Sequence, residues 1–451
     1  MRTQHFKRTR LGLMLVVALA LIVFALVSTS GTAGAAGTGT NAEGMVCTEG
    51  AAINPTFTLK TNTGYVGTPD DNVVFMWGFS EGNSPFQYPS PILCVNEGDT
   101  VTIILQNTLP ESVSIVFPGQ DDVLADGAPA QPQFDVSGNL TSLAQAAPAN
   151  GGSITYSFVA NHPGTFVYQS GTNPAKQVRM GLFGAIVVRP ALEQTNPGRR
   201  FANNRPDSEF NPEGEFMVLF SEIDPYLNQA VELGKGFNMN NYQTRYWMIN
   251  GRGFPDTIAP NFASWLPSQP YGALARVHPF NDSEFLGDGV TPNPAYNPLP
   301  YLERFVNVGT EVIPMHPHAK NALLVNQDGR AVEGPGEEDL AWENFSVPVA
   351  PGQTYDGLFK YRNEEEYSPT NPVPITIPNV PDLVYGQLYS GSPYLGVKGP
   401  LPVGAPDMND CGEFYIISHN HALYQITSWG VPASGPITFL RIDPPLPNAC
   451  H

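Results

Sequence analysis

The stretch SITYSFVANHPGTFVYQ, residues 153–169, decides the fold. It contains two runs rich in β-branched and aromatic residues, Ser153–Ala160 and Gly164–Gln169, on either side of the turn signal His162-Pro163-Gly164. Runs of this length and composition, bounded by Gly, Pro and Asn, are typical of β-strands. The stretch therefore predicts two short strands that are joined by a turn.

The same pattern continues on both sides of this stretch. The other predicted strands of the N-terminal half are Val73–Gly78, Ile92–Val95, Val101–Gln106, Ser114–Phe117 and Ala185–Val188. Those of the C-terminal half are Phe216–Ile223, Arg245–Ile249, Arg304–Val308, Ala322–Val325, Phe345–Val349, Thr354–Tyr361, Phe414–Ile417 and Ile437–Ile442. Short helices are expected only in 144–149 and 222–234. Many short strands at near-regular spacing indicate all-β sandwich or barrel domains.

The length and composition agree with two such domains. A chain of 451 residues exceeds one ordinary core, and 44 glycines with 45 prolines disfavour long helices. We expect an N-terminal domain at 50–192, a linker at 193–214 and a C-terminal domain at 215–451. Two segments of the C-terminal domain, 255–303 and 362–410, are dense in Pro, Asn, Gly and Tyr. Both are predicted to be long loop insertions.

The charge balance excludes one class of partner. The chain has 41 acidic and 22 basic residues, which gives a net charge of −19 at pH 7. Nucleic-acid phosphates would be repelled by this excess of negative charge, so no nucleic-acid partner is expected. The acidity mainly predicts a soluble surface.

The first 36 residues have the layout of an export signal. A basic segment ending at Arg10 is followed by the apolar run Leu11–Val27 and then by small residues up to Ala36. This order is typical of a secretory signal peptide. The alternative is an uncleaved N-terminal membrane anchor, because the apolar run is close to the shortest length that spans a membrane. Either interpretation places the body of the protein outside the cytoplasm, as a secreted protein or in the periplasm or cell envelope.

The cysteines agree with export. The chain has four, Cys47, Cys94, Cys411 and Cys450, and an oxidising compartment favours their pairing. Three pairings are open, of which we prefer Cys47–Cys94 with Cys411–Cys450, because each then stays within one half. None of the spacings forms a CxxC metal or redox motif.

Several motifs, taken in order, resemble the multicopper oxidase family. In the N-terminal half these are Glu97–Val101, Asn107–Leu109, Asp126-Gly127, Pro163–Tyr168 and Gly181–Ala185. In the C-terminal half they are Tyr246–Gly251, Phe254–Asp256, Arg304–Gly309, Val349–Asp356 and two His-x-His pairs. The resemblance covers most of residues 55–445. It implies an all-β fold of two cupredoxin-like Greek-key sandwich or barrel domains with long loop insertions, copper as cofactor and oxidoreductase activity.

The N-terminal half departs from the copper ligands of the family. The family builds a three-copper cluster from four His-x-His pairs, two of them in its first domain. Here the matching positions read Val116-Phe117-Pro118-Gly119 and Gln169-Ser170-Gly171. Both pairs are therefore missing, and the amide of Gln169 is a poor substitute for imidazole on copper.

The C-terminal half keeps its two pairs, His316/His318 and His419/His421. The resemblance places three type 1 copper ligands beside them. Ile313 stands for the first histidine, Asn420 for the electron-carrying cysteine, and Tyr424 or Gln425 for the second histidine. No clear axial methionine follows. A blue copper centre is therefore not expected, and laccase-like reduction of oxygen by this chain alone is disfavoured.

Four histidines in two pairs still suit one metal ion. On an extended strand residues i and i+2 project to the same face, so each pair can point one way if Pro317 allows an extended backbone. Imidazoles in this number favour copper(II) or zinc. We expect one copper ion, type 2 in character, or one zinc ion at His316, His318, His419 and His421.

The sequence leaves two hypotheses for function. The first is an exported multicopper-oxidase-like protein that binds this single metal ion and handles copper or performs limited oxidoreductase chemistry on a small reductant. The alternative is a metal-free cupredoxin scaffold that serves as a structural or interaction protein of the cell envelope. A homotrimer is expected only by analogy with two-domain members of the family.

Overall fold

Two strands that are apolar along nearly their whole length lie at the junction of the two halves. They are β13 (Phe183–Arg189) and β16 (Glu215–Ile223), and almost every residue of both is buried. Successive side chains of a strand point to opposite faces, so continuous burial means that both faces are covered. Ile186 and Val188 pack into the core of the N-terminal half, whereas Ala185 and Val187 pack against residues of the C-terminal half.

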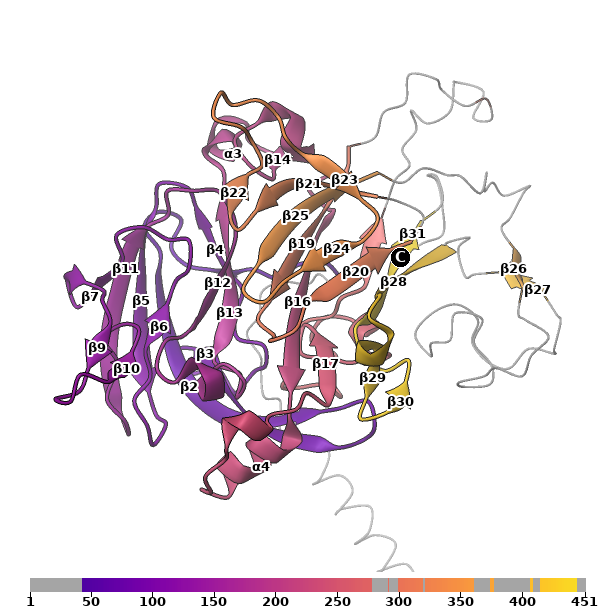
Figure 1. Ribbon diagram of the computed structural model, residues 1–451. Coiled ribbons are helices and arrows are strands. Elements are labelled where there is room, and N and C mark those ends of the chain that lie inside the picture. The colour runs from indigo at the N-terminus through magenta and orange to yellow at the C-terminus, as the bar shows by residue number, and fades with distance from the viewer. Residues whose placement is uncertain are drawn as a thin grey trace, which may run out of the picture. The chain divides into compact units, whose positions relative to one another are not determined.

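The computed structural model describes residues 43–277, 291, 299–318, 321–360, 374–376, 406–408 and 414–443 (Figure 1). Within these ranges the structure is mostly β, with the cupredoxin-like architecture that the sequence predicts. The expected export segment 1–36, much of both expected insertions, Cys411 and Cys450 lie outside the described residues. The boundaries proposed for the two domains stay a prediction, although each large sheet draws its strands from one half only.

The N-terminal half consists mainly of two sheets. The first has the order β1 (Thr48–Glu49), β4 (Leu93–Asn96), β13, β12 (Gly164–Ser170) and β6 (Ile115–Val116). The second has the order β3 (Val73–Glu81), β2 (Thr56–Gly67), β5 (Thr100–Asn107), β11 (Gly152–Val159), β7 (Leu124–Ala125) and β8 (Ala128–Pro129). One apolar core, which includes Ile103 of β5 and Phe166 of β12, joins the two sheets into a sandwich.

The C-terminal half repeats this arrangement, with one sheet of nine strands and one of five. One sheet has the order β22 (Arg330–Ala331), β21 (Ala322–Gln327), β25 (Thr354–Phe359), β19 (Tyr301–Asn307), β16, β17 (Tyr246–Ile249), β29 (Thr427–Ser428) and β30 (Val431–Pro432), and β23 (Trp342–Asn344) pairs with β21. The other has the order β18 (Ala275–Val277), β31 (Ile437–Ile442), β28 (Phe414–Asn420), β20 (Ile313–Pro317) and β24 (Val347–Val349).

The remaining elements are short. The two-stranded sheets pair β9 (Gln133–Phe134) with β10 (Leu140–Ser142), β14 (Arg200–Phe201) with β15 (Glu209–Phe210), and β26 (Pro374–Thr376) with β27 (Pro406–Met408). The α-helices are α2 (Pro174–Gln177), α3 (Ala191–Thr195) and α4 (Pro225–Glu232), and the 3₁₀ turns are η1 (Pro206–Ser208), η2 (Met239–Asn241), η3 (Asp256–Ile258) and η4 (Leu423–Ile426). No helix within the described ranges has the length and apolar content to span a membrane.

One of the two predicted helices forms and the other does not. Helix α4 lies within 222–234, where Asp224 accepts a hydrogen bond from the backbone N–H of Tyr226 and Pro225 occupies the first turn. The segment 144–149 is not helical. The backbone of Ala147 instead bridges Val113, which holds the segment extended along the sandwich.

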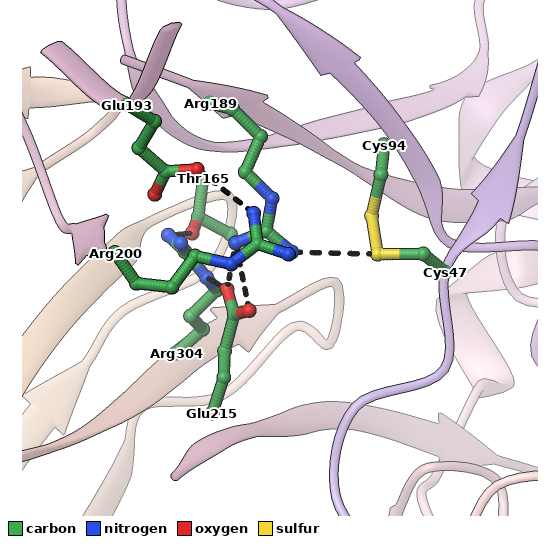
Figure 2. Close-up of a disulfide and its surroundings, with 8 residues drawn as sticks. All are labelled: Cys47, Cys94, Thr165, Arg189, Glu193, Arg200, Glu215 and Arg304. Carbon is green, nitrogen blue, oxygen red and sulfur yellow. Dashed lines mark hydrogen bonds and ion pairs between the residues drawn. A yellow bond between two sulfur atoms is a disulfide. The ribbon is translucent and has the colours of Figure 1, made fainter. Parts of the chain in front are cut away.

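Buried ions tie the two halves together beside the junction. Arg189 donates to both carboxylate oxygens of Glu215 at 2.7 Å, and Arg304 donates to one of them at 2.7 Å (Figure 2). Arg304 also donates to the hydroxyl of Thr165 on β12. Burial would raise the pKa of Glu215, but the two guanidinium charges outweigh burial and lower it to about 2.

The disulfide Cys47–Cys94 forms, as the sequence predicts, and holds β1 against β4. Arg189 approaches the sulfur of Cys47 at 3.5 Å, so the disulfide lies next to the buried ions (Figure 2).

Candidate functional site

The four candidate histidines lie on two neighbouring strands or directly after them, since His318 follows β20 (Ile313–Pro317) and His421 follows β28 (Phe414–Asn420). His316 on β20 is the direct register partner of His419 on β28, and the backbone N–H of His318 bonds to Ile417 on the same strand. The backbone of β20 is extended through Pro317, as the His-x-His interpretation requires. Strand alternation buries Asn420 and leaves the histidines partly or fully exposed on the opposite face.

The imidazole rings form one cluster. Ring centroids are 4.6 Å apart for His316 and His318, 5.3 Å for His316 and His421, and 5.8 Å for His316 and His419. The centroids of His318 and His419 are 5.1 Å apart, and those of His419 and His421 are 5.7 Å apart. The structure therefore brings all four sequence-predicted residues together.

Backbone carbonyls orient two of the rings. The Nδ1 atom of His316 lies 2.6 Å from the carbonyl oxygen of Phe345, and the Nδ1 atom of His419 lies 2.9 Å from the carbonyl oxygen of Asn420. A carbonyl can only accept, so each ring carries its proton on Nδ1 and keeps a lone pair on Nε2. Metal-binding histidines are commonly oriented in this way.

The closest approach within the cluster joins His318 and His419. Their Nε2 atoms are 3.0 Å apart, so the N–H of His318 donates to the lone pair of His419. Burial, followed by repulsion from the neighbouring imidazoles, lowers the pKa of His318. Burial and the same kind of repulsion also lower the pKa of His419 against the opposing effect of its carbonyl contact. Both shifts favour the neutral ring, which is the form that binds metal ions.

Two features of the cluster suit a metal ion. Its donors are imidazole nitrogens, and the Nε2 atoms of His318 and His419 lie at a suitable separation. Two nitrogens that bind one ion at about 2.1 Å, at about a right angle, lie about 3 Å apart, which is the separation of His318 and His419. A third nitrogen does not converge on this pair. Among the described residues, no group of three or more His, Cys, Asp or Glu side chains is placed to hold a metal ion as it stands.

The positions that stand for type 1 copper ligands hold a network of amides. The side chain of Asn420 donates to that of Gln425 at 2.5 Å, and Gln425 donates to the carboxylate of Glu311 at 2.7 Å. Asn420, Gln425 and the neighbouring Ile313 are all buried. We call Asn420, Gln425 and Glu311 the C-terminal bridge. Of the two candidates for the second histidine position, Gln425 points inward, whereas Tyr424 is mostly exposed.

The N-terminal half contains the same construction without histidines. Val116 on β6 is the register partner of Gln169 on β12, in the way that His316 pairs with His419. Behind them Ser170 donates to Gln177 at 2.5 Å, and Gln177 donates to Glu111 at 2.7 Å. We call these three residues the N-terminal bridge.

Sequence reasoning missed both bridges and the carbonyl of Phe345. Backbone carbonyls leave no signal in a sequence. Gln177 lies outside the family motifs named above, so no sequence pattern selected it. Gln425 is one of the two residues that the resemblance places at the second histidine position of a type 1 centre. Of the histidines left outside the site, His162 lies in its predicted turn region and contacts Asp121 at 3.0 Å.

Comparisons with known proteins agree with the architecture. A family model described as multicopper oxidase matches residues 83–193. Laccase abr2 of Aspergillus fumigatus is 26% identical over 214 residues, which are 46% of this chain and 32% of that protein. The L-ascorbate oxidase of Cucurbita maxima is 28% identical over 182 residues, which are 40% of this chain and 28% of that protein. The aligned segments thus span about a third of these relatives.

Solved structures extend the likeness to most of the fold. The blue copper oxidase from Nitrosomonas europaea matches with a TM-score of 0.51 at 16% identity, over 86% of this chain and 85% of that chain. The multicopper oxidase mgLAC matches with a TM-score of 0.50 at 18% identity, over the same shares. Sequence motifs, the family model over residues 83–193, the relatives and the fold agree, and the chain is similar to multicopper oxidases.

Proposed function

We propose that this protein binds one copper ion through His316, His318, His419 and His421, with zinc as the alternative metal. The observation that carries the proposal is the cluster of four imidazoles on two paired strands, with centroids 4.6–5.8 Å apart in five of the ring pairs. Imidazole nitrogens are suitable ligands for copper, and bound copper would supply one-electron chemistry by changing between Cu(II) and Cu(I).

The residues around the cluster support a role in holding copper. Phe345 and Asn420 present carbonyl oxygens that fix two rings, and His421 is exposed, which gives an ion in solution a first contact. Binding a metal ion between His318 and His419 also requires His318 to carry its proton on Nδ1 instead of Nε2, because the hydrogen bond between the two Nε2 atoms engages the lone pair of His419.

Copper handling or limited oxidoreductase chemistry fits this chain better than laccase chemistry. Family members receive electrons at a type 1 centre, and here the C-terminal bridge fills that position with hydrogen-bonded amides. The half of the three-copper cluster that the first domain would supply is replaced by Val116, Pro118, Gln169 and Gly171.

A metal-free scaffold is the second candidate function. The observation that favours it is that three ligand atoms do not converge in the described structure. Both halves then serve only as folded modules, and the exposed face of β20 and β28 is a polar surface for a partner in the cell envelope.

We also propose that the protein acts outside the cytoplasm, secreted or in the cell envelope. The basic, apolar and small-residue order of residues 1–36 and the disulfide Cys47–Cys94 support this placement.

The metal content of the full chain, measured after copper loading and removal of loose ions, tests the proposal. We expect about one copper per chain by elemental analysis, with a type 2 signal in electron paramagnetic resonance and no blue absorbance. His316→Ala and His419→Ala should each lose the ion. The matched control is His162→Ala, which removes an imidazole from another part of the fold.

Three results would contradict it. Wild-type protein without retained copper or zinc supports the scaffold instead. Three or more coppers per chain, or a blue band, would mean that ligands outside the four histidines complete the centre. Equal copper retention in His316→Ala and wild type would assign the bound ion to another place.

A further inference from the structure

A pocket of about 180 Å³ lies between three elements of the described structure. Its walls come from α4, from the start of β3 with the preceding Asn72, and from the turn between β29 and β30, and Tyr246 of β17 also lines it. None of the four histidines lines it. At about 30 Å³ for each water molecule, the volume suits a ligand of only a few heavy atoms. Figure 1 shows α4 and the β29–β30 turn near the same end of β17.

Three aromatic rings surround this space. Trp429 meets Tyr226 edge to face at a centroid distance of 5.6 Å, and meets Tyr246 edge to face at 6.1 Å. Tyr226 and Trp429 are about half exposed, whereas Tyr246 is buried and forms the floor. The lining of the pocket therefore contains three aromatic side chains that pack against one another.

The backbone at Trp429 is strained in a way that presents its ring. Trp429 has φ 48° and Gly430 has φ 85°, the conformation of a two-residue hairpin turn with both central residues left-handed. Asn or Gly normally occupies the first of these positions, and a bulky residue there is an outlier. A tryptophan that persists at such a position indicates a use for its side chain beyond forming the turn.

The charges around the rings have one sign. Glu232 lines the pocket, and its carboxylate accepts a hydrogen bond from Tyr65 at 2.5 Å, which fixes its position. Asp70 lies just behind the floor, where it accepts from the hydroxyl of Tyr246 at 3.0 Å. The ten described residues that line the pocket include no lysine or arginine.

We propose that this pocket binds a small organic cation, in particular a quaternary ammonium group. Aromatic faces attract cations through their quadrupoles, and a cage of several rings with a nearby carboxylate suits a charge that cannot donate hydrogen bonds. The net charge of −19 also raises the local concentration of cations. This inference is independent of the proposed metal site.

Two other ligand classes fit the same residues less well. A neutral apolar molecule would gain from the rings but nothing from Glu232 and Asp70. A sugar ring would stack on Trp429 but needs several hydrogen-bonding side chains around its hydroxyls, and the pocket offers chiefly Asn72, Gln229 and Glu232. Asn72 is already engaged with Asp70 and Tyr246.

The test compares choline with dimethylbutanol, in which a carbon replaces the charged nitrogen, and with glucose. Each is titrated into the full chain by calorimetry and by tryptophan fluorescence. We expect saturable choline binding and at least about tenfold weaker binding of the alcohol and of glucose, because only the charge distinguishes choline from its isostere.

Two variants locate the site. Trp429→Asn removes the ring while placing the preferred residue in the turn, so the fold is kept, and choline affinity should fall by about tenfold or more. Glu232→Gln keeps an acceptor for Tyr65 but removes the charge. It should weaken choline by about three- to tenfold and leave the alcohol unchanged. Trp265→Gln, at another exposed tryptophan, is the matched control and should bind choline as the wild type does.

Equal affinity for choline and dimethylbutanol would overturn the proposal in favour of a simple apolar pocket. Tighter binding of glucose would replace it with a sugar site. It would also be overturned by absence of choline binding to the wild type, or by unchanged binding in Trp429→Asn.

Discussion

The strand pairs β6/β12 and β20/β28 are built alike and differ in what they carry. In both, a residue of the first strand faces its partner in register, Val116 with Gln169 and His316 with His419. In both, the residue next to that partner turns inward and donates to a buried glutamine. The outward-facing side chains differ, and the inward residue is Ser170 in one pair and Asn420 in the other.

The likeness extends to the loops that support each pair. Asn107 and Asn307 each donate to the carbonyl four residues ahead, that of Glu111 and that of Glu311, at 2.8 Å. The carboxylate of each of those glutamates then accepts from the bridging glutamine. The comparison teaches that hydrogen bonding of the framework is separable from metal ligation, because one half keeps the framework with no imidazole at the strand pair.

The strongest challenge to this comparison exchanges the side chains of the two pairs. In His316→Val/His419→Gln the C-terminal pair takes the residues of the N-terminal pair. Loss of two ligands should lower copper affinity by at least about 1,000-fold with the fold retained. Competition with a chelator measures the affinity, and circular dichroism checks the fold.

The reciprocal variant Val116→His/Gln169→His is the control. It should gain only a weak second copper, since it offers two imidazoles instead of four. Tight binding there, or no loss in the first exchange, would mean that the strand pair does not determine copper binding.

A second prediction concerns Glu303 in the C-terminal half. Glu303 lies four residues before Asn307, and the matching residue of the N-terminal half is Ile103, which lies four residues before Asn107. Ile103 packs in the core, but Glu303 is buried with one carboxylate oxygen unpartnered, and burial raises its pKa to about 8. The folded chain then keeps a proton that the unfolded chain releases above pH 4.5. The contribution of Glu303 to the free energy of unfolding should therefore be most favourable at or below pH 4.5 and fall as pH rises toward 8.

Glu303→Gln should remove this dependence. Between pH 4.5 and pH 7 the free energy of unfolding should fall by about 3 kcal/mol more in the wild type than in the variant, as measured by urea unfolding. Glu343→Gln, at an exposed carboxylate, should follow the wild type. Parallel curves for Glu303→Gln and wild type would show that Glu303 is ionised in the folded protein.

The two bridges should differ in strength. Asn420→Ala leaves the buried carbonyl of Gln425 and the backbone N–H of Ala422 without partners, which should cost about 3 kcal/mol. Ser170→Ala removes a smaller group and should cost about 1–2 kcal/mol in the same urea measurement. A loss below 0.5 kcal/mol in both, on the order of an exposed surface change, would refute a structural role for the bridges.

The smallest effect should come from the outer end of each bridge. Lys176 donates to Glu111 at 2.5 Å, and at the matching place Tyr424 donates to Glu311 at 2.7 Å. Lys176→Met and Tyr424→Phe should each cost less than about 1 kcal/mol. Only the cost of Lys176→Met should shrink as salt rises from low ionic strength, because only Lys176 carries charge. Equal salt dependence would contradict this difference.

Much of the fold could be predicted from local patterns. Runs such as Ser153–Ala160 and Ile437–Ile442 identified strands, because β-branched and aromatic residues concentrate where strands bury one or both faces. The strand β2 was not predicted. Its sequence TFTLKTNTGYVG is mostly polar, and it forms because β3 and β5 pair with it on both sides.

The site was predictable in its residues but not in its geometry. His-x-His spacing identified the four histidines, although β20 was absent from the predicted strands. Its prolines argue against a strand, yet Pro314 faces Pro348 of β24 across the pairing, where neither requires a donor. The contact between His318 and His419 joins residues 101 positions apart. The outer links of the bridges, from Gln177 to Glu111 and from Gln425 to Glu311, span 66 and 114 positions, which a local pattern cannot reveal.

The disulfide has a topological consequence for assembly. The bond between Cys47 and Cys94, which are 47 positions apart in the sequence, closes a covalent ring that contains the whole β2–β3 hairpin. Strand β3 is an edge strand of its sheet. An outer hairpin on an open chain is a natural arm for exchange between molecules, which yields intertwined dimers. The disulfide holds the Cα atoms of Cys47 and Cys94, which flank this hairpin in the sequence, 5.5 Å apart, so oxidation opposes such domain swapping and reduction permits it.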